Sequence, residues 1–414
     1  MSARPYVPRL AEARLEQLFA GLPALSIVGP RATGKTTVAR RLSRSMVALD
    51  DPVEARAFEA DADAALAALP EPVLLDEWQA VPGVLGAVKR AVDRGSGAGR
   101  FLLTGSVRAK FTGATWPGTG RVVDVQMYGL TVREIVGRLT GDPFLSRLAQ
   151  ADIDAFAVPA DPPDLVGYIE LALRGGFPDA ALDSSPDTRG AWLSGYLDQL
   201  LSRDPETLQE DRDPHRLRLY FEALALNTAG LAQSKTLYDA ARIDHKTASA
   251  YERLLSNLLV LDTLPAWSTN RLSRMTRTGK RYLVDTSLVA AALDLDERAV
   301  LRDGDLLGRT IDTFVLAQIR PEVALTSRPP RLYHLRTRDA RHEIDLIAER
   351  AGGDVIAVEI KSSSAPTRGD ARHLEWLRDQ LGERFLAGAV LHTGPRPFHL
   401  SERIFALPIA TLWG

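Results

Sequence analysis

One short segment near the N-terminus restricts the possible fold of this chain more than any other. It reads Gly29, Pro30, Arg31, Ala32, Thr33, Gly34, Lys35 and Thr36, and it fits the pattern G-x-x-x-x-G-K-[ST]. An apolar strand is expected just before it, at 24–28, and a helix just after it, at 36–43. In that context the glycines allow backbone N–H groups to surround phosphates, and the helix N-terminus adds a favourable dipole. The sequence therefore predicts a P-loop; the alternative is a glycine-rich turn that binds no ligand.

The predicted P-loop assigns roles to individual side chains. Lys35 would reach the β- and γ-phosphates of a bound nucleotide, and the Thr36 hydroxyl would bind a magnesium ion. Thr37, the next residue, belongs to the same phosphate-binding segment. ATP and Mg²⁺ are thus the expected ligands of this part of the chain.

Two acidic residues end another apolar segment, about 40 residues after the P-loop. The strand expected at 72–76 ends in Asp76, and Glu77 follows it. In a P-loop ATPase, Asp76 would orient magnesium through water, and Glu77 would polarise the attacking water. A solvated turn is the alternative. A further strand, at 100–104, leads to Thr104 and Ser106. If this strand lies beside the Asp76 strand, Thr104 or Ser106 would act as a sensor of the γ-phosphate; the alternative is a turn that merely ends the strand.

Arginine dominates the basic residues of the chain. The 51 basic residues comprise 7 lysines and 44 arginines, so a lysine inside a motif is hard to attribute to chance. Arg121 and Arg108 are candidates for a finger that neutralises charge on the transferred phosphate. In so arginine-rich a chain, an ordinary surface position is the alternative for each.

The composition excludes several classes of protein. The chain has no cysteine, which excludes disulfides, thiolate metal sites and cysteine nucleophiles. The net charge of −2 gives no overall basic field for nucleic acid. No run of about 18 apolar residues is present, and residues 1–10 lack the apolar core of a signal peptide. We expect a soluble cytoplasmic protein with no membrane partner.

Changes in pattern along the chain predict an α/β protein with three domains. Residues 1–140 alternate apolar strands with helices, which is typical of a parallel sheet with crossover helices. The proline-containing segment 141–163 is predicted as a linker, and 164–280 as a helical domain. Residues 281–414 return to an α/β pattern and form the third predicted domain.

The helical region contains a predicted helix-turn-helix. Helices at 234–241 and 245–258 flank a short turn, and the second helix has an apolar stripe at helical spacing. This helix could present His245, Lys246, Ser249 and Arg253 to a DNA groove, or the module could pack against protein. A basic stretch follows, which either contacts phosphates or forms a solvated loop. It contains Arg271, Arg274, Arg277, Lys280 and Arg281.

Eight segments, in order along the chain, carry a family resemblance. They are VPRLAEARLEQL, GPRATGKTT, VLLDEWQ, FLLTGS, GGFPDA, RYLVDTSLVAAAL, EIDLI and VEIKSSS. The chain resembles a prokaryotic family of AAA+-type P-loop ATPases with a C-terminal domain of unknown function. The resemblance implies an ATPase domain, then a winged helix, then a restriction-endonuclease-like domain of the PD-(D/E)xK kind.

The nuclease-like fold implied by the resemblance needs an acid on one strand and Glu-x-Lys on the next. Asp345, Glu359 and Lys361 supply that set, in which the two carboxylates would hold magnesium and the lysine would position water. On the preceding helix, Asp312 stands where the family usually has glutamate. Strand alternation places Ile344, Leu346 and Ala348 on one face of their strand. It predicts their antiparallel pairing with Ile360, Val358 and Ile356 across a three-residue loop at 351–353, which would place Asp345 opposite Glu359.

Three functions are compatible with these patterns. The first is Mg²⁺-dependent ATP hydrolysis coupled to binding or processing of DNA or RNA by the C-terminal half. The second is an ATP-gated regulatory protein, for instance of a toxin–antitoxin or defence system, whose nuclease-like domain is inactive and binds a protein partner. The third is a DNA-binding switch. A homo-oligomer is compatible with each of them.

Overall fold

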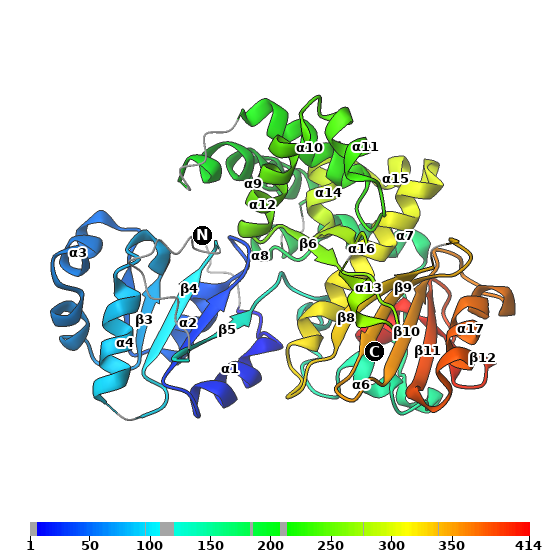
Figure 1. Cartoon of the computed structure of the whole chain (residues 1–414), viewed down its shortest axis with the longest axis horizontal. Coiled ribbons are helices and arrows are strands. Elements are labelled where there is room, and N and C mark those ends of the chain that lie inside the picture. The colour runs from blue at the N-terminus through cyan, green and yellow to red at the C-terminus, as the bar shows by residue number, and fades with distance from the viewer. Residues whose placement is uncertain are drawn as a thin grey trace. The chain divides into compact units, whose positions relative to one another are not determined.

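A computed structural model describes residues 6–95, 97–107, 120–182, 185–207, 213–275, 277–337 and 339–414. The chain divides into two compact units (Figure 1). The first comprises Met1–Gly129 with the short stretch Asn257–Leu259, and the second comprises the rest of the chain.

The first unit is built on a five-stranded parallel sheet, as the strand and helix alternation predicts. Its strand order is β2-β3-β4-β1-β5. The strands are β1 (Ala24–Val28), β2 (Ser45–Ala48), β3 (Val73–Asp76), β4 (Phe101–Gly105) and β5 (Val122–Gln126). Sequence patterns did not indicate β5. It lies at an edge of the sheet, and Val125 is its one buried residue, so its five residues show no regular alternation of buried and exposed positions.

Strand alternation divides the core of this unit between the two faces of the sheet. Leu74 and Leu102 pack with helices α1 (Ala11–Phe19) and α2 (Lys35–Leu42). The flanking strand residues pack on the opposite face with α3 (Pro52–Ala67) and α4 (Val84–Arg94). Because both faces are covered, the strands are apolar throughout, and polar side chains gather where the strands end.

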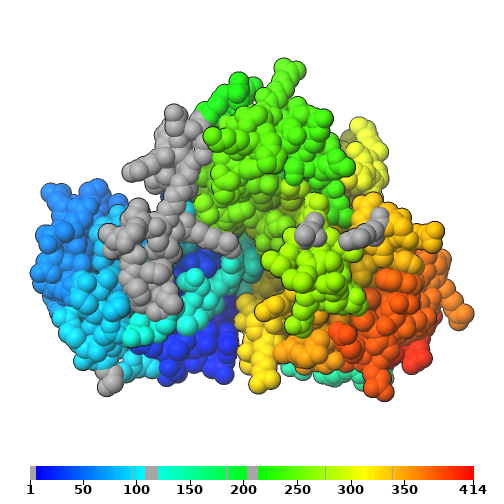
Figure 2. Space-filling view, viewed as in Figure 1, coloured from blue at the N-terminus to red at the C-terminus, as the bar shows by residue number. Residues whose placement is uncertain are grey.

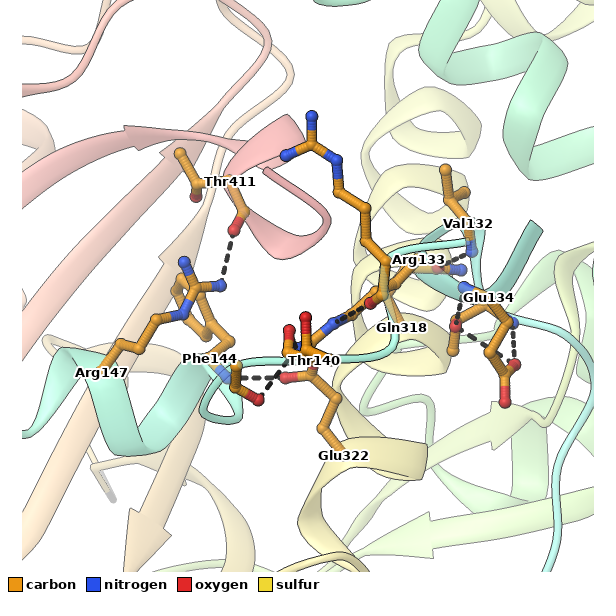
Figure 3. Close-up of polar contacts among 12 residues, drawn as sticks. Val132, Arg133, Glu134, Thr140, Phe144, Arg147, Gln318, Glu322 and Thr411 are labelled. Carbon is orange, nitrogen blue, oxygen red and sulfur yellow. Dashed lines mark hydrogen bonds and ion pairs between the residues drawn. The ribbon is translucent and has the colours of Figure 1, made fainter. Parts of the chain in front are cut away.

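Residues 141–163, which the sequence predicts as a linker, pack in the second unit together with residues 130–140. Their short helices α5 (Val132–Ile135) and α6 (Phe144–Leu148) contribute buried side chains to the main core of the second unit. Helix α16 (Gly304–Val323) fixes this segment through buried polar contacts (Figure 3). The segment is therefore an integral part of the second unit, although its prolines are typical of a connection.

Two side chains of α16 make these contacts. Glu322 forms a buried ion pair with Arg133 and accepts a hydrogen bond of 2.6 Å from the Phe144 backbone N–H. Gln318 accepts one of 2.8 Å from the Val132 backbone N–H. These partners lie almost 190 residues apart in the chain, so no local pattern indicates them.

Helices form most of the middle of the second unit. They are α7 (Leu165–Arg174), α8 (Pro178–Ala181), α9 (Pro186–Thr207), α10 (Pro214–Leu226), α11 (Ser234–Ala240), α12 (His245–Asn257), α14 (Thr286–Leu293) and α15 (Glu297–Arg302). The apolar stripe predicted on α12 is confirmed, since Tyr251, Leu254 and Leu255 are buried.

The helix pair α11–α12 leads into a two-stranded hairpin. Strand β6 (Leu261–Leu264) pairs antiparallel with β7 (Lys280–Leu283), and their connection contains the one-turn helix α13 (Arg271–Arg274). The predicted boundary between 280 and 281 therefore falls inside β7. Because β7 pairs with β6, it belongs with the helices before it and not with the C-terminal sheet.

The loop after α7 contains Gly175 and Gly176, and its surroundings show why glycine is needed there. The buried carboxylate of Asp285 accepts hydrogen bonds from the backbone N–H groups of Gly176 and Ser287, at 2.8 and 2.9 Å. A β-carbon on Gly175, whose φ is +68°, would lie 2.3 Å from that carboxylate. Glycine at 175 is therefore required by this close approach.

A mixed six-stranded sheet forms the C-terminal part, with the order β12-β13-β11-β10-β9-β8. Its strands are β8 (Arg331–Arg336), β9 (Glu343–Glu349), β10 (Val355–Ile360), β11 (Phe385–His392), β12 (Phe398–Ser401) and β13 (Ile404–Pro408). Helix α16 contributes to the core on one face, and α17 (Arg372–Leu381) to the core on the other.

The predicted register of β9 and β10 is confirmed for two of its three pairs. Leu346 pairs with Val358 and Ala348 with Ile356, but the ladder ends before the predicted pair of Ile344 with Ile360. The connection has three residues between Arg350 and Asp354, and both of its glycines, Gly352 and Gly353, have positive φ. Across the described ranges, no helix is long and apolar enough to cross a membrane.

Candidate functional site

The loop between β1 and α2 has the backbone of a phosphate-binding loop. Ala32 and Gly34 adopt φ values of +58° and +90°, which turn the chain back on itself. A β-carbon on Gly29 would lie 2.1 Å from the Met127 carbonyl oxygen, so only glycine fits there. Arg9, which sequence patterns did not indicate, fixes the loop from outside through a 2.7 Å hydrogen bond from Nη1 to the Thr33 carbonyl.

Lys35 is the first residue of α2 and is almost fully buried. Its Nζ donates a hydrogen bond of 2.7 Å to the Pro30 carbonyl oxygen of the same loop. Burial lowers the pKa of Lys35 to about 8, although Glu77 and Asp76 favour the charged form. The buried Lys35 ammonium thus donates to a neutral carbonyl. A phosphate would be a stronger partner, because a charged acceptor gives a stronger hydrogen bond.

Strand β4 lies between β1 and β3, which brings the P-loop, Asp76 and Thr104 together. Asp76 accepts hydrogen bonds from the Thr36 hydroxyl, at 2.8 Å, and from the Thr104 hydroxyl. Burial raises the pKa of Asp76, while these two hydroxyls lower it. The Thr36 hydroxyl, at the start of α2, and the Asp76 carboxylate, at the end of β3, are the oxygen ligands that a P-loop protein offers to magnesium. These two residues therefore fit the ion.

Glu77 directly follows β3 in a left-handed conformation with φ +48°. Its carboxylate accepts hydrogen bonds from the Ser106 hydroxyl, at 2.9 Å, and from the Gln79 side chain. The Glu77 N–H donates to the Thr104 hydroxyl at 3.3 Å. The structure therefore groups Thr104 and Ser106 with the two acids, as their expected place on the neighbouring strand implies. Sequence patterns gave no sign of Gln79.

Arg121 is not brought to this group. Strands β1 and β5 are parallel, with Ala24 opposite Val122, so Arg121 lies at the end of the sheet away from the P-loop. The five-residue strand separates the two ends by roughly 13 Å. Arg121 is exposed and forms an ion pair of 2.7 Å with Asp93. Arg108 lies outside the described residues.

At this position a finger role would require Arg121 to reach the nucleotide of a neighbouring subunit, and an ordinary surface position is the alternative. If Arg121 is such a finger, Arg121→Ala should lower the ATPase rate without lowering ATP affinity, and mixing it with a Lys35→Ala chain should restore part of the rate. Phosphate release measured on the mixed and separate chains tests this. A monomeric chain that keeps full activity after the substitution excludes the role.

The residues of the predicted nuclease set surround a lysine that the prediction placed elsewhere. Lys280 opens β7 and is almost fully buried, with its Nζ 2.8 Å from Asp345, 3.6 Å from Asp312 and 3.7 Å from Glu343. The Tyr282 hydroxyl donates to the other oxygen of Asp312 at 3.1 Å. We call Lys280, Asp312, Asp345 and Glu359 the acidic cluster.

The β8–β9 pair shifts register next to Asp345. Tyr333 pairs with Ile347, but Leu335 pairs with Ile344, so β9 accommodates one extra residue there. Ile344 consequently packs in the α17 core, whereas Leu346 and Ala348 pack in the α16 core. The expectation that these three residues share one face was wrong, because a bulge re-aims side chains, and alternation alone does not indicate one.

The β9–β10 ladder ends at Leu346 and Val358, one pair before Asp345 and Glu359. The carboxyl groups of Asp345 and Glu359 nevertheless lie within hydrogen-bonding reach of each other, as the predicted register implies, and Asp345 Oδ2 also accepts the Ile360 N–H at 3.0 Å. Lys361 Nζ lies 3.4 Å from Glu359 Oε2, as the alternation predicts. The described residues hold no group of three or more His, Asp or Glu side chains placed for a metal. With an ammonium among the acids, this set does not fit a divalent cation.

The basic stretch around α13 is not free to contact phosphates as a unit. Arg274 bonds to Glu349 through both terminal nitrogens, and Arg281 forms an ion pair with Glu252. Arg277 donates to the Arg336 carbonyl at 3.0 Å, while Arg271 is exposed. On α12, by contrast, His245, Lys246 and Arg253 are exposed, and Ser249 is half-buried.

Three families match successive parts of the chain. Residues 22–136 match the AAA domain. Residues 166–299 and 307–412 match two domains of unknown function, DUF8612 and DUF4143. The chain therefore carries an AAA-type P-loop ATPase domain followed by two domains to which no activity is attached.

Two curated proteins are similar over almost the whole chain. They are the uncharacterized proteins Rv2008c of Mycobacterium tuberculosis and Mb2031c of Mycobacterium bovis. Each is 30% identical over 406 residues, covering 97% of this chain and 83% of the relative. Among solved structures, a Walker-type ATPase of Pyrococcus abyssi is similar with a TM-score of 0.41 and 14% identity, over 70% of this chain and 96% of that one.

Proposed function

Because the chain belongs to the same family as these two mycobacterial proteins and carries an AAA-type P-loop domain, we propose that it hydrolyses ATP with the help of Mg²⁺. The observation that carries the proposal is the hydrogen-bonded group at the strand ends, in which Asp76 joins Thr36 of the P-loop to Thr104 of β4. Such a group orients oxygen ligands beside the phosphate-binding loop.

Each residue of the group has a distinct task in this mechanism. The loop N–H groups and Lys35 hold the phosphates, and Lys35 exchanges its bond to the Pro30 carbonyl for bonds to phosphate oxygens. Thr36 and Asp76 would hold the magnesium ion, which neutralises charge on the phosphates when bound. Glu77 accepts a proton from the attacking water, and Ser106 and Gln79 orient its carboxylate.

The test of this proposal is phosphate release from ATP by the purified full chain. Turnover should require Mg²⁺ and should stop when EDTA removes the ion. A folded chain that binds ATP without releasing phosphate would instead be a nucleotide-gated switch.

For the second unit we propose two alternative functions, nucleic-acid binding or processing and the binding of a protein partner. One observation favours partner binding. Binding or processing of DNA or RNA is supported by the exposed basic residues of α12, and a nuclease would require a divalent cation at Asp345 and Glu359. The buried Lys280 ammonium beside Asp345 favours the other function, an inactive nuclease-like domain that binds a protein partner under the control of ATP.

Two assays separate these functions. Nuclease activity on DNA and RNA substrates, with and without ATP, identifies the first. Retention of DNA that weakens steeply with salt identifies phosphate contacts even where no cleavage occurs. If the chain neither cleaves nor retains nucleic acid, partner binding is the function that remains of the two.

A further inference from the structure

The acidic cluster already contains a cation of its own. We propose that Lys280 is the resident cation of this cluster, and that the cluster becomes a site for a divalent cation such as Mn²⁺ or Mg²⁺ only when the ammonium is removed. The inference rests on the proposal that the nuclease-like domain is inactive, and it is independent of ATP hydrolysis in the first unit.

The ammonium of Lys280 lies where the carboxylates converge. Its nearest oxygens belong to Asp345 of β9 and Asp312 of α16. An ammonium is a compact point charge, similar in this respect to a metal ion and unlike the broad guanidinium. The chain has only 7 lysines among 51 basic residues, and two of them, Lys280 and Lys361, contact these acids.

All four carboxylate oxygens of Asp345 and Asp312 already face a partner within the cluster or beside it. Asp345 bonds to Lys280 through Oδ1 and to the Ile360 N–H through Oδ2. Asp312 bonds to the Tyr282 hydroxyl through Oδ1 and faces Lys280 with Oδ2. A divalent cation needs several oxygens at about 2.0–2.6 Å and would lie against the ammonium, where two positive charges repel strongly in a buried site.

Electrostatics at the cluster agree with a charged lysine. Burial opposes ionisation of Asp345, but the nearby Lys280 ammonium outweighs it and lowers the pKa of this carboxyl to about 2. Burial and the neighbouring Asp345 together raise the pKa of Glu359 well above its ordinary value. Its Oε1 is buried without a hydrogen-bond partner in the described part of the chain. The short ion pair and the lowered pKa both assign the Lys280 cation to Asp345.

The hairpin holds Lys280 in place. Residues Lys280 and Tyr282 project from the same face of β7, and both reach Asp312. The connection from β6 to β7 is bonded to the edge strand β8, because the Trp267 N–H donates to the His334 carbonyl at 2.6 Å and the His334 N–H donates to the Pro265 carbonyl at 3.0 Å. Figure 2 shows this yellow-green connection at the surface, in front of the orange strands of the sheet.

Replacing Lys280 with methionine tests the inference, because methionine keeps much of the side-chain volume and removes the charge. In calorimetry of the nucleotide-free chain, Lys280→Met should bind about one more Mn²⁺ ion than wild type does. The affinity of the cluster for Mn²⁺ should be at least about tenfold higher in the variant than in wild type. Mn²⁺ should also raise the melting temperature of the variant and leave that of wild type unchanged.

Two further variants make the result specific to the cluster. Adding Asp345→Asn to Lys280→Met should abolish the new site. Lys89→Met is the matched control, because Lys89 also bonds to a single carboxylate at 2.8 Å, that of Asp93, but on the exposed surface of the first unit. It should bind Mn²⁺ as wild type does.

Two results would overturn the inference. One is a folded Lys280→Met chain that binds Mn²⁺ no better than wild type. The other is wild-type binding of Mn²⁺ that Asp345→Asn removes, and this measurement needs no Lys280 variant to fold. Mn²⁺ binding is measured without nucleotide, so neither result depends on whether the chain hydrolyses ATP.

Discussion

Replacing Lys35 with alanine is expected to weaken ATP binding by at least about 100-fold, to the point where calorimetry detects none. The Lys35 ammonium is buried in the P-loop, and among the described residues its hydrogen bond goes to the neutral Pro30 carbonyl. Without it, the phosphates keep the loop N–H groups but lose their only direct charge partner in the loop interior.

The same substitution should leave the first unit folded. The core side of α2 is formed by Val38 and Ala39, which the change does not touch. Circular dichroism and the melting temperature check this point. Lys89→Ala, which removes an exposed lysine, is the control and should bind ATP as wild type does. Equal ATP affinity in Lys35→Ala and wild type would refute the P-loop assignment.

Replacing Glu77 with glutamine should preserve ATP affinity but lower the rate of hydrolysis about 100-fold or more. Glutamine has nearly the same shape, so its side-chain oxygen can still accept the Ser106 hydrogen bond. It cannot accept a proton from water, however. The loss should therefore appear in kcat and not in the dissociation constant of ATP.

Steady-state phosphate release and nucleotide titration, made on the same preparation, separate these two quantities. Glu71→Gln is the matched control, since Glu71 pairs with Arg100 at the surface and has no contact with the P-loop. Hydrolysis that survives in Glu77→Gln within a factor of a few would mean that another group activates the water.

The amino-acid sequence by itself determined those features that depend on neighbouring residues. The P-loop is one, because glycine positions and the following helix fix its backbone within eight residues. The β9–β10 register is another, because strand alternation and the glycines at 352 and 353 specify both the pairing and the loop length. The buried stripe of α12 follows equally from helical spacing.

The tertiary structure alone decided which distant side chains meet. Arg9 reaches the P-loop from 24 residues away, and Lys280 meets Asp345 across 65 residues. The packing of residues 130–163 in the second unit likewise depends on Glu322, far along the chain. No local period encodes such contacts, because burying a charge is favourable only where the fold happens to bring its partner. Lys280, which the sequence analysis grouped with the arginines of a basic stretch, is for this reason a buried cation among acids.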